Sequence, residues 1–224
     1  MKDKTDLLPT EEDAARIVQR VLEESVINVN RFVTGACHFV YDVITESGRN
    51  VVARIARPEN RHFLAGAVYW YKFLKPKGLP LPTIISYDLD ATVFPFPYMV
   101  LERIAGEDLG IVYSQLSGAE KKALANEIAR VQNIAGSLPL GRGFGYVDSY
   151  ESESFHRTWT DVLYGSLKKS LMRIEAVGIM DVRHVDRVAK KLDNYQSYFS
   201  QVSPRLFLDD TTTRNVIVHQ GKLS

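Results

Sequence analysis

The sequence predicts an α+β protein, with a β-rich first half and a helix-rich second half. Three β-rich runs separated by turn residues fill much of positions 26–56, and the helical period dominates after Gly106. The composition, 45% hydrophobic and 25% charged over 224 residues, is that of a globular chain long enough to bury a core. We therefore expect two domains, at residues 1–105 and 106–224.

The first half begins with a helix and continues mainly in strands. Residues 10–25 form the helix, because Thr10 can cap it, Asp13 follows three positions later and an apolar stripe recurs at helical spacing. Strands are expected at 26–33, 37–45, 50–56, 79–88 and 97–104, and a second helix at 61–75. Residues 34–36 and 46–49 have the small and polar composition of hairpin turns.

Helices dominate the second half. The apolar period predicts helices over 117–136, 156–177 and 182–200. Two short apolar runs near the end, 206–208 and 215–219, flank a polar loop rich in threonine.

Charge and cysteine content exclude several classes of protein. Lys and Arg number 28 against 27 Asp and Glu, so the net charge of +1 argues against nucleic-acid binding through bulk charge. No run of eighteen apolar residues predicts a membrane span, and the first thirteen residues lack the apolar region of a secretory signal. Cys37 is the single cysteine, so we expect a cytoplasmic, reduced protein with no internal disulfide.

The strongest chemical motif is the stretch from Asp210 to Asn215, which precedes a β-like run. A loop aspartate can accept a proton from a hydroxyl nucleophile, and an asparagine amide oxygen can bind Mg²⁺. An ordinary surface loop is the alternative, because Asp, Thr and Asn are also common in turns.

The expected hairpin turn at Thr34, Gly35, Ala36, Cys37 and His38 is a second candidate. Small residues at a hairpin tip let backbone N–H groups approach phosphate oxygens. A plain hairpin explains the same residues equally well.

Two further candidates lie in predicted strands. Arg54 is the only charge in an apolar strand and can project toward phosphates, unless it lies on an edge strand facing solvent. Glu102, Arg103 and Ile104 end another apolar strand just before Gly106, where backbone groups can pair with an adenine edge. A simple strand end followed by a turn is the alternative.

Other catalytic classes find no support. The five histidines lack the spacing of a zinc site, and no nucleophile motif of a hydrolase is present.

The order of these pieces resembles the aminoglycoside phosphotransferase family, small-molecule kinases related to choline kinase. The resemblance is carried by VVARIA, KGLPLPTIISYD, YMVLERIAGEDL, the helix ending near Ile134, GFGYV and LDDTTTRNVIV, which together touch both halves of the chain. It implies a protein-kinase-like two-lobed fold, with a nucleotide-binding lobe at 1–105 and a mainly helical lobe at 106–224 that carries the substrate site and catalytic loop. Members transfer the γ-phosphoryl group of a nucleotide to a hydroxyl on a small molecule.

The resemblance also implies a role for each candidate. Asp210 matches the catalytic aspartate and Asn215 the magnesium-binding asparagine. Arg54 stands where a phosphate-pairing lysine is usual, and residues 34–39 match the loop that covers the nucleotide. Glu102 to Ile104 match the hinge that holds adenine. ATP or GTP and Mg²⁺ are the implied cofactors.

Four departures accompany the resemblance. Leu208 and Asp209 replace the usual His-Gly, and arginine at position 54 is not a neutral exchange for lysine. The usual glutamate of the second helix falls at about Ala67. The sequence stops at Ser224, before the strand that brings a second metal-binding aspartate and before further helices of the substrate lobe.

Two functions therefore remain open at this stage. The first is a Mg²⁺-dependent kinase acting on a small-molecule hydroxyl, aminoglycoside-like or other, bound near residues 148–161. The second is a non-catalytic kinase-like protein that binds a nucleotide or a partner. An unrelated α+β binding domain would have to match all six segments in order by chance. In a truncated chain, the unpaired sheet edge and exposed apolar surface would favour self-association.

Overall fold

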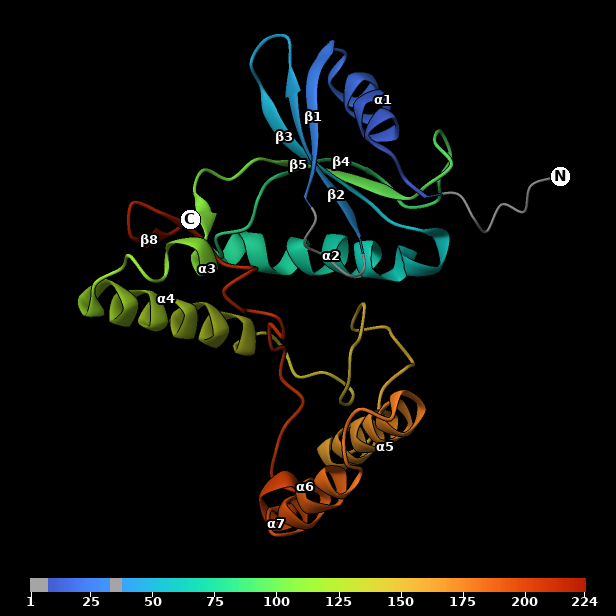
Figure 1. Cartoon of the computed structure of the whole chain (residues 1–224), viewed down its shortest axis with the longest axis vertical. Helices are drawn as coiled ribbons and strands as arrows, with labels where there is room; N and C mark the ends of the chain where they lie inside the picture. Colours follow the sequence, from blue (N-terminus) through green and yellow to red (C-terminus); the bar gives the residue numbers. More distant parts are fainter. Residues whose placement is uncertain (1–7, 33–37) are drawn as a thin grey trace, which may run out of the picture. The chain divides into compact units, whose positions relative to one another are not determined.

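The computed structural model describes residues 8–32 and 38–224, and its elements are labelled in Figure 1. The chain divides into two compact units, Met1–Ile134 with Leu208–Ser224, and Ala135–Phe207. The boundary that the sequence predicts at residue 105 divides a nucleotide-binding part from a substrate-binding part. The two compact units are defined by contacts and do not test this functional division. Among the described residues, no helix combines the length and apolar character needed to cross a membrane.

The first unit is built on a five-stranded antiparallel sheet with the order β1-β2-β3-β5-β4. The strands confirm the five predicted ones, with β4 shorter than expected because Pro80 and Pro82 have no N–H to donate to a ladder. The strand bounds are Val26–Phe32, Phe39–Thr45, Asn50–Ile55, Ile84–Asp88 and Tyr98–Glu102. The turn joining β2 and β3 is the predicted hairpin, with Gly48 at φ +82°.

Helix α1 (Glu11–Leu22) covers one face of this sheet (Figure 1). Its Ala14, Ile17 and Val18 are fully buried against alternate residues of β2, β3 and β5. The predicted cap is confirmed: the Thr10 hydroxyl accepts from the Asp13 N–H at 3.2 Å, and the Asp13 carboxylate accepts from the Thr10 N–H at 3.0 Å.

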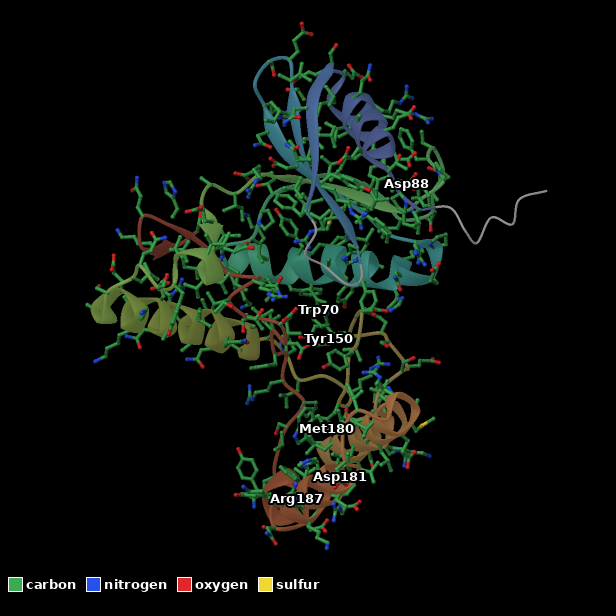
Figure 2. All side chains as sticks on the ribbon, in the orientation of Figure 1. Trp70, Asp88, Tyr150, Met180, Asp181 and Arg187 are labelled. Atoms are coloured by element: carbon green, nitrogen blue, oxygen red, sulfur yellow. The ribbon has the colours of Figure 1, made fainter. Side chains whose placement is uncertain are left out.

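Helix α2 (Arg61–Leu74) packs against the residues that alternate with these. Leu64 and Val68 lie against Met99 and Leu101 of β5, with Val52 of β3 beside them. Trp70 lies on the same helix, with its ring centroid 5.1 Å from that of Tyr69 (Figure 2). Arg54 lies two positions after Val52 on β3, and side chains two positions apart on a strand point to the same face. The Arg54 side chain therefore leaves the sheet on the face opposite α1.

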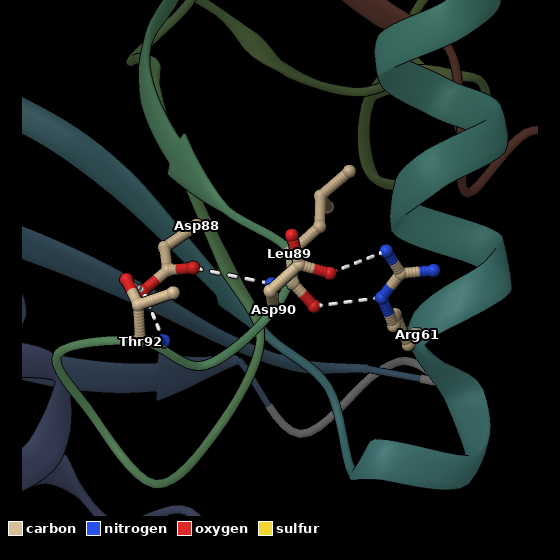
Figure 3. Close-up of polar contacts among 5 residues, drawn as sticks. All are labelled: Arg61, Asp88, Leu89, Asp90 and Thr92. Atoms are coloured by element: carbon tan, nitrogen blue, oxygen red, sulfur yellow. Dashed lines mark hydrogen bonds and ion pairs between the residues drawn. The ribbon is translucent and has the colours of Figure 1, made fainter.

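The loop after β4 is tied to the start of α2 (Figure 3). The Arg61 guanidinium donates to the Leu89 carbonyl at 2.9 Å and to the Asp90 carboxylate at 2.6 Å. Burial raises the pKa of Asp88, but hydrogen bonds from the Thr92 hydroxyl and from backbone N–H groups outweigh it, so the net pKa is lowered. These bonds fix the second helix to the sheet that it covers.

A second, three-stranded sheet lies in the same unit, with the order β6-β7-β8. It joins β6 (Glu107–Asp108) to β7 (Ile217–His219) and β8 (Lys222–Leu223). The short helix α3 (Leu109–Val112) and α4 (Gly118–Gly136) accompany it, and Leu109, Leu124, Val216 and Val218 form its core. This pairing brings the segment after the hinge next to the segment after the Asp210 loop.

The second unit contains helices α5 (Trp159–Val177), α6 (Arg183–Asp193) and α7 (Gln196–Phe199). The helix expected at 156–177 starts three residues later, because Thr158 caps it with Asp161. The helix expected at 182–200 is broken at Asn194 and Tyr195. Asp181, labelled in Figure 2, lies in the turn before α6, and its carboxylate accepts from the Arg183 N–H at 2.9 Å.

Candidate active site

Arg54 extends from an interior strand of the large sheet. Strand β3 pairs with β2 on one side and β5 on the other, so the edge-strand alternative is wrong. The Arg54 Nε is shielded from solvent and has no hydrogen-bond partner among residues 8–32 and 38–224. Burial lowers the pKa of this guanidinium. A partly buried cation is stabilised when an anion pairs with it.

His38 adds a second polar group beside Arg54. Its Nε2 is also buried and unpartnered within the described part of the chain. Burial, followed by the positive charges of Arg54 and His62, lowers the pKa of His38 to about 4. The other members of the predicted phosphate-covering turn, Thr34, Gly35, Ala36 and Cys37, lie outside the described residues.

The predicted hinge runs from the end of β5. The Glu102 carboxylate accepts from the Thr83 N–H at 3.2 Å, and hydrogen bonds from the Thr83 hydroxyl and N–H lower its pKa. The Glu102 N–H donates to the Thr83 carbonyl at 2.9 Å. The hinge backbone at this position is therefore engaged with the start of β4.

Arg103 is held by an ion pair that sequence reasoning missed. Its Nε donates to the Asp42 carboxylate at 3.1 Å, and its Nη1 donates to the Ile104 carbonyl at 3.1 Å. The guanidinium also lies 5.5 Å from the centre of the Phe32 ring. Asp42 lies on β2, far from the hinge in sequence, so only the antiparallel register could have revealed this pair.

The Asp210–Asn215 loop closes on itself. The Asn215 Nδ2 donates to the Asp210 carbonyl at 3.0 Å, and the Asn215 N–H donates to the Thr212 carbonyl at 3.0 Å. Since a carbonyl can only accept, the carboxamide orientation is fixed and Oδ1 points away from this bond. Both residues are exposed, and the bond from the Asn215 side chain to the Asp210 backbone joins the two ends of the motif.

The loop is anchored at both ends by helices of the same unit. At its start, Gln132 of α4 makes hydrogen bonds to Leu208 and Thr211. At its end, the Gly110 N–H donates to the Thr213 carbonyl at 2.8 Å and the Leu109 N–H donates to the Val216 carbonyl at 2.8 Å. The run 206–208 forms no strand, because both backbone groups of Leu208 are bound to Gln132.

Gly106 allows the segment after β5 to approach β7, the strand that follows this loop. Its φ is +121°, and a Cβ there would lie 2.5 Å from the Val218 carbonyl oxygen. Only glycine permits this approach of β6 to β7 without displacement.

The motifs in the sequence did not predict that Gln132 binds the Asp210 loop. Gln132 carries a weak signal in the sequence, because it is a polar side chain between Val131 and Ala135 on the buried side of α4.

Two surface hollows, beside α1 and around Gly106 and β7, are lined by none of the predicted site residues. Within the described ranges, no group of three or more His, Cys, Asp or Glu side chains forms a metal site.

Several solved structures share this fold. The streptomycin-ATP-APH(2")-IIa ternary complex is 16% identical, covers 97% of this chain and 69% of its own, and has a TM-score of 0.65. The GDP and kanamycin complex of an APH(2") enzyme is 14% identical, with 94% and 68% covered and a TM-score of 0.70. The macrolide 2'-phosphotransferase type I is 13% identical, with 97% and 71% covered and a TM-score of 0.61.

These likenesses confirm the predicted α+β, kinase-like fold. A comparison with the curated proteins finds no match. The family described as the phosphotransferase enzyme family matches residues 29–224, which include Arg54, the hinge and the Asp210 loop. The match spans most of the chain and agrees with the expected resemblance, and the chain belongs to the phosphotransferase enzyme family.

Proposed function

We propose that this protein is a Mg²⁺-dependent kinase that transfers the γ-phosphoryl group of ATP or GTP to a hydroxyl of a small molecule. The observation that carries the proposal is Arg54, whose shielded Nε has no partner among the described residues. A nucleotide phosphate would supply the missing anion, and a guanidinium can bind it with two parallel hydrogen bonds. Family membership supports the same chemistry.

In this proposal, Asp210 orients the acceptor hydroxyl and takes its proton. Its exposed carboxylate stands on a loop that hydrogen bonds fix at both ends. Asn215 would hold Mg²⁺ through its amide oxygen, since its amide nitrogen is bound to the Asp210 carbonyl. An oxygen donor suits this hard cation, which when bound neutralises charge on the phosphates.

The nucleotide would lie between the phosphate-binding groups and the hinge. Thr34 to His38 would cover its phosphates. The backbone at Glu102, Arg103 and Ile104 would hold the adenine or guanine edge, apart from the Glu102 N–H, which is bound to Thr83. Similar structures contain ATP in one case and GDP in another, which supports a nucleotide of either kind.

The acceptor would be a polar small molecule with a free hydroxyl. Similar structures are described with streptomycin, gentamicin and kanamycin, and another is a macrolide phosphotransferase. These compounds form the first set to screen. The single cysteine fits a reducing compartment, so we place the activity in the cytoplasm.

A non-catalytic nucleotide-binding protein is the second candidate. Ala67 is exposed on α2 and offers no carboxylate to Arg54, and Leu208 and Asp209 precede Asp210 in place of His-Gly. The two candidates agree on nucleotide binding and differ on turnover, so separate experiments test them.

Nucleotide binding is tested by the melting temperature with MgATP and with MgGTP. A ligand at 100 times its dissociation constant stabilises the fold by about 2.7 kcal/mol, which raises the melting temperature by several degrees. Arg54→Met should abolish most of this increase, whereas Arg49→Met, exposed in the β2–β3 turn, should retain it. Equal increases in the two variants would remove Arg54 from the nucleotide site.

Turnover is tested by Asp210→Asn in an acceptor screen that measures nucleoside diphosphate release. We expect the rate to fall by about 10² to 10⁴-fold while the nucleotide-induced increase in melting temperature is retained, because the lost group acts on a proton. Asp209→Asn is the matched control and should keep its activity. Nucleotide binding without turnover by the unaltered protein would favour the non-catalytic candidate.

A further inference from the structure

We propose that Gln132 is a positioning residue of the phosphotransferase, holding the loop that carries Asp210. The inference rests on the proposed function, since it assigns Gln132 a role through Asp210 rather than contact with a substrate. It adds a residue from α4, a helix that carries none of the predicted site residues.

The carboxamide of Gln132 binds the loop with both of its polar atoms. Its Oε1 accepts from the Leu208 N–H at 3.0 Å. Its Nε2 donates to the Leu208 carbonyl at 2.7 Å and to the Thr211 hydroxyl at 3.0 Å. The Leu208 N–H can only donate, so the two arms of the carboxamide cannot be exchanged.

These bonds fix the chain immediately before Asp210. Leu208 is the first residue of the segment that returns to the first compact unit, and both of its backbone groups are held. Thr211, on the other side of Asp210, is held by the same carboxamide. Asp210 is thus bracketed by two residues that share one anchor.

The anchor is well placed to resist displacement. Gln132 is half-buried on α4 and lies between Val131 and Ala135, which pack in the core. Because the contacts to Leu208 use backbone atoms, they do not depend on the side chain at that position. Other restraints on the loop are the Asn215 side chain, which binds the Asp210 carbonyl, and the N–H groups of Gly110 and Leu109, which bind its far end. Loss of Gln132 would therefore loosen Leu208 and Thr211, on either side of Asp210, while these other bonds remain.

Displacing a catalytic group by about 1 Å can cost about 10²-fold in rate, without any change in nucleotide affinity. The inference thus predicts a loss in kcat alone. A merely structural role would lower the melting temperature and the fraction of active protein, and would leave the kcat of the folded fraction unchanged.

The test uses Gln132→Met, which keeps the length of the side chain and removes its hydrogen bonds. Asn133→Ala, exposed on the adjacent position of α4, is the matched control. Three quantities are measured on the whole chain: amide hydrogen exchange over residues 206–216, the dissociation constant for MgATP, and kcat, per mole of nucleotide-binding protein, with an acceptor that the unaltered protein phosphorylates. We expect faster exchange and a kcat lowered by about 10 to 10²-fold in Gln132→Met, with MgATP affinity retained and the control unchanged.

Unchanged exchange over residues 206–216, or faster exchange with an unchanged kcat, would overturn the inference. Weaker MgATP binding in proportion to the lost activity would also overturn it, because it would indicate a general structural effect. If the unaltered protein phosphorylates no acceptor, the proposed function fails and the catalytic role of Gln132 fails with it. In that case, the exchange measurement still decides whether Gln132 anchors the loop.

Discussion

At the scale of single residues, the strand position of Arg54 decides what its charge can do. On an edge strand, a guanidinium reaches water and needs no partner. On β3, between two other strands, Arg54 is partly buried, its charge acts on His38, and its Nε is buried with no partner among the described residues. An anion would stabilise a guanidinium in this position, which is why we propose a nucleotide phosphate as its partner.

His38 should make the protein less stable in mild acid. Its pKa is lowered from 6.5 to about 4, chiefly by burial and then by Arg54 and His62. Between pH 6.5 and about 4, His38 is protonated in the unfolded chain and stays neutral in the folded chain. The free energy of unfolding therefore falls as the pH falls through this range. The shift sets an upper limit of about 3 kcal/mol, and the partial exposure of the ring reduces the expected loss to about 1–2 kcal/mol.

Chemical denaturation of the unaltered protein and of His38→Gln between pH 4 and 8 measures this loss. As the pH falls, the unaltered protein should lose more free energy of unfolding than His38→Gln. Any stability advantage of the unaltered protein at pH 8 should therefore shrink or reverse at pH 4. Parallel curves over this range would rule out His38 as the source.

Arg54 and the Asp210–Asn215 loop could be singled out from the sequence because each is a local pattern, one charge in an apolar strand and one polar loop before a β-like run. Their roles stay predictions. Asp42 and Gln132 could not be singled out, because each acts on a residue far away in the sequence. Asp42 meets Arg103 only through the order of strands in the sheet, and Gln132 meets Leu208 only after the chain has returned from a second unit. Local pattern holds no information on such pairings.

At the scale of elements, the close contact between β6 and β7 depends on one glycine. Gly106 combines a φ of +121° with a carbonyl oxygen 2.5 Å from the place of a Cβ. The segment that follows β5 and the segment that follows the Asp210 loop are thereby paired, with Glu107 opposite Val218. The two-residue strands β6 and β8 were not predicted from the sequence, because so short a run carries no periodic signal.

Gly106→Ala should destabilise the first unit by about 2–4 kcal/mol, through backbone strain and the displacement of Val218. Gly118→Ala is the control, because a Cβ at Gly118 meets nothing within 4 Å and its φ is ordinary for L-residues. We expect the control to be neutral or more stable by up to about 1 kcal/mol. Thermal unfolding monitored by circular dichroism distinguishes the two, and equal melting temperatures would contradict the role of Gly106.

At the scale of the whole chain, buried side chains are distributed unevenly between the two units. The sheet and α1 share many fully buried residues, among them Ile17, Tyr41 and Val100. None of the residues of α5, α6 and α7 is buried, and Met172, Ile179, Met180 and Tyr198 are largely exposed. Local stability follows burial, so it should differ between the units.

Amide hydrogen exchange should therefore be fastest in α5–α7 and slowest in β2, β3 and β5. Exchange should become faster over residues 159–199 at denaturant concentrations that leave residues 39–55 protected. Simultaneous loss of protection in both regions would show that the chain unfolds as one cooperative body.

The pairing of β6 with β7 also sets an order of events during synthesis. The large sheet uses residues 26–102 alone, so all of its strands are available once that stretch has left the ribosome. The Asp210 loop must wait for more than a hundred further residues, which at about 5–20 residues per second is a delay of several seconds to tens of seconds. A newly made chain thus forms the sheet that carries Arg54 well before the loop that carries Asp210.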